Sequence, residues 1–292
     1  MLPVLVDLKF IKIYTFGVFL VLAFFWGSFV LWKNIRLTPQ KEEEIFDGLF
    51  LSLAGSLFFS RIIYVILNFE KFGFSILKFI LINGYPGLSL YGALFGGFFT
   101  LFLYLLVKKI SFKETIDYFV SPIFIALAFG KLGSFFSGSE IGEQAEFFLS
   151  IKYVGFDGLR HLTPLYEAIF FSLGAYFCHK LLFAVRKQTY VSGFVFYFFC
   201  WYFALTYFLF DKIKANRLYL IPIKSGLKGV SFNFILSAVI LLTFSIYFLY
   251  YFRNSVLSYG KPTYKKIAKK FGRSITKRNK KPTKANSGAE KK

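Results

Sequence analysis

Residues 128–142 read AFGKLGSFFSGSEIG, and residues 160–168, beyond a polar loop, read RHLTPLYEA. Long apolar runs flank this stretch, so its charged residues would lie at or inside the ends of membrane helices. A charge near the centre of a membrane helix costs roughly 2.5–3.5 kcal/mol on insertion scales. For one such residue, snorkelling to the interface or simple pairing explains the position equally well. A cluster beside four glycines favours a functional site. Its members are Lys131, Glu140, Arg160, His161, Tyr166 and Glu167.

The composition is that of a polytopic membrane protein. Of the 292 residues, 56% are hydrophobic, and the mean hydropathy of +0.57 excludes an ordinary soluble domain. The two cysteines, Cys178 and Cys200, lie in apolar runs without an evident disulfide partner. His161 and His179 are the only histidines, so no metal-ligand spacing exists. We therefore expect neither a metal nor another cofactor.

Seven apolar segments are long enough to cross a bilayer, which takes about 20 residues at a rise of roughly 1.5 Å each. We expect an all-α protein with seven transmembrane helices, at about 14–32, 48–68, 88–107, 118–136, 165–182, 193–210 and 232–252. The first is a span and not a cleavable signal, because its apolar run is too long and no small-x-small site follows it. Segment 74–82 is apolar but too short, which predicts an interfacial or re-entrant piece.

Residues 253–292 differ abruptly from the membrane domain at 1–252. They hold fourteen Lys/Arg and a single acidic residue, Glu290. We expect a poorly ordered tail held on anionic lipid, since each juxtamembrane basic residue contributes about 1 kcal/mol of attraction. Nucleic-acid binding is the weaker alternative, because the tail is tethered to seven spans.

The loops after spans 1, 3 and 5 are basic, which predicts a cytoplasmic tail and an N-terminus on the outer side. Their cations are Lys33, Arg36, Lys41, Lys108, Lys109, Lys113, Arg186 and Lys187. The outer loop after span 6 breaks this pattern. Its cations suggest an anionic partner, such as a lipid phosphate, although a partly folded loop would also tolerate them. They are Lys212, Lys214, Arg217, Lys224 and Lys228.

Arg61 lies well inside the second span, about ten residues before Lys71 and so roughly 15 Å deep. An arginine at that depth must face a cavity, a partner or the interior of the helix bundle. Arg61 is therefore a further candidate site residue.

Five segments, in order and with matching spacing, resemble the bacterial prolipoprotein diacylglyceryl transferase family. IKIYTFG at 11–17, SRIIYVI at 60–66 and GLSLYGALFGG at 87–97 resemble its opening segment, its second span and its glycine-rich third span. GKLGSFFSGSEIG at 130–142 resembles the signature G-R-I-G-N-F-x-N-G-E-x-x-G, and RHLTPLYEA resembles R-H-P-S-Q-L-Y-E-A. The resemblance covers roughly the first 250 residues and leaves out the basic tail.

The chain departs from the family pattern within the signature itself. Lys131 replaces its arginine, and Ser134 and Ser137 replace its two asparagines. Ser139 stands at its glutamate, with Glu140 adjacent. These changes are compatible with a divergent enzyme or with an inactive relative.

Two further departures lie in other spans. Tyr91 stands where many members have a histidine, and Tyr207 and Asp211 replace a late Arg-x-x-x-Glu pair. Tyr91 and His161 become the two candidate bases under the resemblance, since the family's chemistry requires a thiol proton to be removed.

The resemblance implies transfer of the diacylglyceryl group of phosphatidylglycerol to the lipobox cysteine thiol of a prelipoprotein. The products are a thioether and glycerol phosphate, so the site needs cations for the departing phosphate and an acceptor for the thiol proton. It also implies a multi-pass protein of the bacterial cytoplasmic (inner) membrane. Its partners would be phosphatidylglycerol, prelipoprotein signal peptides and membrane lipids, with no nucleic acid.

Each candidate residue receives an expected role under the resemblance. Arg160, Lys131 and Arg61 would hold phosphate, while Glu167 and Asp211 would orient cations or donate and accept hydrogen bonds. The residues expected to act in catalysis are Tyr91, His161, Arg160 and Glu167. Those expected to bind substrate are Arg61, Lys131, Ser134, Ser137, Glu140, Tyr14, Tyr166 and Asp211.

Two other functions remain open from the sequence. One is an inactive relative that binds lipid or signal peptides, which the signature changes favour. The other is a transporter of lipids or small molecules, which Arg61 and the glycine-broken helices would suit. The lack of an evident internal repeat weakens the transporter hypothesis.

Overall fold

The protein is a bundle of long membrane helices. The computed structural model describes residues 2–8, 11–36, 38–81, 85, 87–153, 155–215, 217 and 229–253. Among these residues, seven helices are long and apolar enough to cross a membrane, which confirms the polytopic helical prediction. They are α1 (Thr15–Ile35), α2 (Glu42–Leu67), α5 (Leu90–Val107), α6 (Phe112–Ser137), α7 (Thr163–Arg186), α8 (Phe194–Phe210) with the 3-10 turn η1 (Asp211–Ile213), and Phe232–Arg253.

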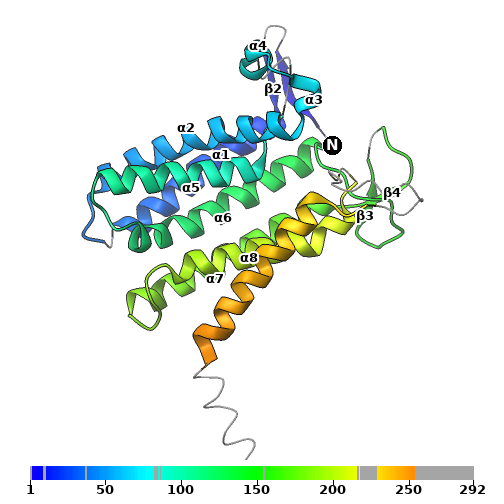
Figure 1. Cartoon of the computed structure of the whole chain (residues 1–292). Coiled ribbons are helices and arrows are strands. Elements are labelled where there is room, and N and C mark those ends of the chain that lie inside the picture. Colours follow the sequence, from blue (N-terminus) through cyan, green and yellow to red (C-terminus); the bar gives the residue numbers. More distant parts are fainter. Residues whose placement is uncertain are drawn as a thin grey trace, which may run out of the picture. The chain divides into compact units, whose positions relative to one another are not determined.

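The chain divides into two compact units, Met1–Leu241 and Leu242–Lys292. In the first unit, α6 packs against both α1 and α7, α7 packs against α8, and α5 packs along α2 (Figure 1). The second unit contains the last turns of the seventh span. Most of the predicted basic tail, and Lys224 and Lys228, lie outside the described residues, so the predictions about them stay predictions.

Three of the helix ends that form the site described below are fixed by capping residues in the local sequence. Ser89 caps the N-terminus of α5, and its hydroxyl accepts a hydrogen bond from the Gly92 N–H at 3.3 Å. Gly138 ends α6 in the left-handed conformation (φ 71°), which glycine adopts without steric cost. Pro164 lies in the first turn of α7, where its missing N–H leaves no hydrogen bond unmade.

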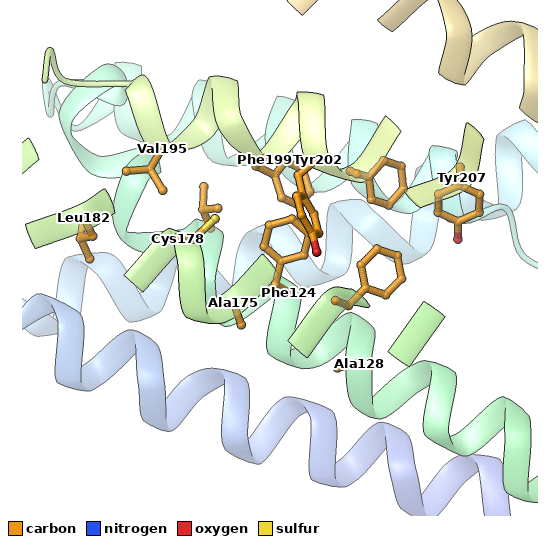
Figure 2. Packing of buried hydrophobic residues seen from close by; sticks show 12 residues of the cluster. Phe124, Ala128, Ala175, Cys178, Leu182, Val195, Phe199, Tyr202 and Tyr207 are labelled. Carbon is orange, nitrogen blue, oxygen red and sulfur yellow. The ribbon is translucent and has the colours of Figure 1, made fainter. Parts of the chain in front are cut away.

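The largest apolar cluster joins α6, α7 and α8. Phe124 and Phe171 are fully buried in it, and their ring centroids lie 6.0 Å apart. At Gly174 a side chain would meet the Tyr202 ring at 2.9 Å, so α7 and α8 approach closely there. Figure 2 shows the cluster running along α8 as far as Tyr207. This packing holds α8 in register and thereby fixes Tyr207 at the site described below.

Helix α6 begins six residues before the predicted span because its polar first turns are also helical. Asp117 lies in these turns and is 1% exposed. Its carboxylate accepts hydrogen bonds from the Gly193 N–H at 2.7 Å and the Phe196 N–H at 3.0 Å, at the start of α8. A buried carboxylate that meets the N-terminus of a neighbouring helix is stabilised there, so hydropathy alone understated the length of α6.

Among the described residues, four short strands, which the sequence did not predict, accompany the helices. β1 (Val4–Leu8) and β2 (Ile11–Tyr14) pair antiparallel, as do β3 (Ser150–Lys152) and β4 (Leu159–His161). The predicted interfacial piece at 74–82 contains the short helix α4 (Ile76–Ile80), and a second short helix, α3 (Phe69–Phe72), precedes it. All these elements are too short to cross a bilayer and lie between spans or before the first.

Candidate active site

A buried ion-pair network forms where α6 ends, α7 begins and η1 follows α8. The Lys131 Nζ lies 2.8 Å from Glu167 Oε2, and the Lys214 Nζ lies 2.6 Å from Glu167 Oε1. The Glu167 side chain is completely buried, so both its oxygens depend on these two ammonium groups. Each residue comes from a different part of the chain, and the bundle core holds all three in place.

Glu140 reaches the same network from the loop after α6. Its two oxygens lie 2.7 and 2.6 Å from the Lys131 Nζ, and the Ser134 hydroxyl lies 3.4 Å from Oε1. Burial disfavours the charged form, but the positive charges of Lys131 and Lys214 outweigh it and hold the pKa of Glu140 below its usual value. The left-handed Gly138 turns the chain so that Glu140 can fold back over Lys131.

The ring of Tyr207 forms one wall of the network. The Lys214 Nζ lies 4.4 Å from its centroid and the Lys131 Nζ 5.8 Å, both within the range of cation–π attraction. Tyr91 packs against it with centroids 5.9 Å apart. Among the described residues, no group hydrogen-bonds to the buried Tyr91 hydroxyl. A polar group is therefore available beside the two cations.

The two lysines, Glu140 and the two tyrosines line a cavity of ≈ 270 Å³, whereas Glu167 and Ser134 lie behind them and do not line it. It combines two ammonium groups, a carboxylate and several hydroxyls with an apolar remainder, which suits a ligand with one anionic and one apolar part. Its polar lining residues are Ser89, Tyr91, Lys131, Glu140, Thr163, Tyr207, Lys214 and Asn233, and its apolar ones are Leu67, Leu90, Ile141 and Phe232.

Comparison with known proteins places the chain in a family. Residues 3–250 match the family model described as prolipoprotein diacylglyceryl transferase. The chain belongs to the prolipoprotein diacylglyceryl transferase family. The match ends before the basic residues 253–292, as the resemblance of the motifs does.

Similar proteins, each named phosphatidylglycerol–prolipoprotein diacylglyceryl transferase, occur in several bacteria. The one from Clostridium tetani is 28% identical over 194 residues, which cover 64% of this chain and 75% of that protein. The one from Clostridium botulinum strain Langeland is 24% identical over 243 residues, covering 80% and 91%. The one from Listeria welshimeri is 25% identical over 228 residues, covering 74% and 80%.

Lys214 is the charged residue of this network that sequence reasoning did not select. The sequence did show an excess of cations after span 6 and suggested an anionic partner for them. For Lys214 that partner is a carboxylate of the protein itself, Glu167. Asp211 helps to place it, since the Asp211 carbonyl accepts from the Lys214 N–H at 3.2 Å and the Ser231 hydroxyl donates to the Asp211 carboxylate. Asp211 itself does not line the cavity.

Arg61 is buried, and its hydrogen-bond partners lie in the segment between α2 and α5. Its Nε, Nη1 and Nη2 donate to the carbonyls of Phe79, Gly87 and Lys78 at 2.9, 2.9 and 2.8 Å. The guanidinium also lies 5.0 Å from the Phe72 ring centroid. Arg61 therefore ties the segment containing α4 to the start of α5, and it is not among the residues that line the cavity.

Arg160 and Lys131, which we both expected to hold phosphate, have different neighbours. The Arg160 Nη1 donates to the Gly142 carbonyl at 3.2 Å, and its guanidinium lies 5.2 Å from the Phe156 ring centroid. Arg160 does not line the cavity, whereas Lys131 does. The strand β4 thus directs Arg160 toward the loop that carries Glu140, and any effect of Arg160 on that residue is through the loop.

Four further candidates do not line the cavity. The His161 ring packs beside Tyr166 with centroids 6.3 Å apart, and the Tyr166 hydroxyl donates to the Leu149 carbonyl at 2.9 Å. The Ser137 hydroxyl donates to the Ser134 carbonyl at 3.3 Å. Tyr14 is exposed, directly before α1. These contacts serve the surrounding loops and helix ends.

Proposed function

We propose that this chain transfers the diacylglyceryl group of phosphatidylglycerol to a cysteine thiol of a prelipoprotein, the first step of lipoprotein maturation. Membership of the transferase family and the names of its relatives support this function. The observation that carries it within the chain is the pair Lys131 and Lys214, held by the buried Glu167 beside a cavity at the helix ends.

The reaction requires stabilisation of a departing phosphate. The thiol sulfur forms a bond to a glyceryl carbon while that carbon's bond to the phosphate oxygen breaks, so negative charge grows on the phosphate. Lys131 and Lys214 are fixed before the reaction begins, and fixed cations stabilise such a transition state more than the ground state. An apolar surrounding strengthens this effect, because little water screens the charges.

The thiol proton must also find an acceptor. Of the two predicted bases, Tyr91 lines the cavity and His161 does not. We assign Tyr91 the role of a relay, in which its hydroxyl oxygen accepts the thiol proton while its own proton passes to the departing phosphate oxygen. The proton count then balances, and the free hydroxyl of Tyr91 supports the assignment.

The orientation follows from the ends that form the cavity. They are the end of α2, the start of α5, the end of α6, the start of α7, the end of α8 and the start of the last span. Because successive spans alternate in direction, all these ends lie on one side, opposite the basic loops after spans 1, 3 and 5. With those loops and the basic residues 253–292 in the cytoplasm, the cavity lies in the outer half of the bacterial cytoplasmic membrane. A lipobox cysteine would reach it there.

The test is thioether-linked diacylglyceryl transfer from phosphatidylglycerol vesicles to a lipobox peptide, together with complementation of a transferase-depleted bacterium. Wild-type protein should be active. Lys131→Met should lower turnover about tenfold to a hundredfold, since a charged hydrogen bond contributes roughly 1.5–3 kcal/mol. Lys131→Arg should preserve or raise it, because arginine can contact two phosphate oxygens.

Lys108→Met is the matched control, since it removes an exposed lysine at the opposite end of α5. It should leave turnover within twofold of wild type. No transfer by the wild-type protein, with phosphatidylglycerol still bound, would favour the inactive relative. Movement of lipid between leaflets without transfer would favour the transporter.

A further inference from the structure

The two cations of the cavity are already neutralised within the protein. Lys131 and Lys214 supply two positive charges, and their direct ionic partners Glu140 and Glu167 supply two negative ones. A phosphate ester that enters the cavity therefore meets no net positive charge from this group. One carboxylate has to move away from the Lys131 ammonium before the phosphate can make a full ionic contact with it.

The two carboxylates differ in how easily they can move away from the lysines. Glu167 projects from α7, is completely buried and contacts both lysines. Glu140 projects from a loop, its side chain is 40% exposed, and Lys131 is its only ion-pair partner among the described residues. Withdrawing Glu167 would leave Lys214 without an ion-pair partner among the described residues, whereas Lys131 keeps Glu167 when Glu140 rotates into water.

We propose that Glu140 is an internal competitor for the substrate phosphate. It occupies the Lys131 ammonium in the free enzyme, the phosphate ester displaces it on binding, and it returns when glycerol phosphate departs. This inference rests on the proposed function, because it assumes that a phosphate ester enters the cavity. Glu140 is thus a positioning residue that lowers the affinity of the enzyme for substrate and product alike. It favours ligands whose anionic group can replace the Glu140 carboxylate at Lys131.

The size of the effect follows from the fraction of time that Lys131 is free. Apparent affinity falls in proportion to the population that can bind. If Glu140 occupies Lys131 for about nine-tenths of the time, removing its charge lowers the apparent dissociation constant about tenfold. Substrate and product should gain equally, so a neutral variant should also be inhibited more strongly by accumulating glycerol phosphate.

The experiment measures glycerol phosphate binding to the purified full-length protein in nanodiscs of zwitterionic lipid. Glu140→Gln, and Glu140→Ser as a second neutral variant, should each bind about tenfold more tightly than wild type. Glu140→Asp keeps the charge and should stay within about threefold. Glu146→Gln removes a charge from an exposed position in the same loop and should change nothing. In a second arm, the KM for phosphatidylglycerol in the transfer assay should fall in parallel for the neutral variants.

Equal or weaker glycerol phosphate binding by either neutral variant, with a wild-type melting temperature, would overturn the inference. A gain shared by Glu146→Gln would also overturn it, because loop charge alone would then explain the effect. The binding arm needs no catalysis, so its result can be read whether or not the protein transfers the diacylglyceryl group. An active wild-type enzyme with unaltered binding in the variants would refute this inference alone.

Discussion

Replacing Glu167 by Gln should destabilise the protein strongly. The substitution keeps the shape of the side chain and removes the charge that lies 2.8 Å from the Lys131 Nζ and 2.6 Å from the Lys214 Nζ. Lys131 keeps Glu140, but Lys214, whose side chain is 12% exposed, loses its ion pair. Removing one partner of a buried pair leaves an uncompensated charge and costs about 3–5 kcal/mol.

A second substitution tests that reasoning directly. In the double variant Glu167→Gln, Lys214→Met, the stranded cation is removed together with its partner. The double variant should therefore lose less stability than the two single losses added together, by about 2 kcal/mol. That figure lies within the range of about 0.5–3 kcal/mol measured for residues in direct contact.

The free energy of unfolding can be measured by denaturant titration in mixed micelles, followed by tryptophan fluorescence. Glu43→Gln is the control, because Glu43 is exposed in the first turn of α2 and should change stability by about 0.5 kcal/mol or less. A loss below about 1 kcal/mol for Glu167→Gln would refute the buried-charge reasoning. Strictly additive losses in the double variant would show that Glu167 and Lys214 do not depend on each other.

Three further predictions concern other parts of the protein. Arg160→Ala should slow transfer by less than about tenfold in the lipobox-peptide assay, because Arg160 contacts the loop that carries Glu140 and does not line the cavity; a loss of about a hundredfold would show that it contacts the substrate. Asp117→Ala should cost at least about 2 kcal/mol in the micelle titration, because two buried N–H groups lose their acceptor at about 1–3 kcal/mol each. Asp117→Asn, which keeps one acceptor, should cost less. A cysteine at position Ser287 should resist an impermeant thiol reagent added to intact cells, and labelling from outside would reverse the proposed orientation.

The membrane spans could be predicted from the sequence because the signal is local. A helix that crosses a bilayer needs only an apolar run of sufficient length, and each of the seven runs satisfies that by itself. The predicted ends of the spans were less accurate where a buried polar residue has its hydrogen-bond partner on another helix. Asp117 would be unfavourable in an isolated span, yet the start of α8 supplies its hydrogen bonds.

The candidate site was partly predictable for the same reason. Lys131, Glu140 and Glu167 stand at the end of one span, in the loop after it and at the start of the next, so the order of the chain brings them together. Because Arg61 lies deep in the second span, the sequence likewise indicated that it needs polar surroundings inside the protein. That the partners are the carbonyls of Phe79, Gly87 and Lys78 depends on how the loop folds back.

Tertiary structure alone selected Lys214 from several loop cations and brought it to Glu167. It also separated Tyr91, which lines the cavity, from His161, which does not. The sequence determined which residues are charged and near which helix end each one lies. It did not determine the pairs, because an ion pair forms only where packing brings the two charged groups within about 4 Å of each other.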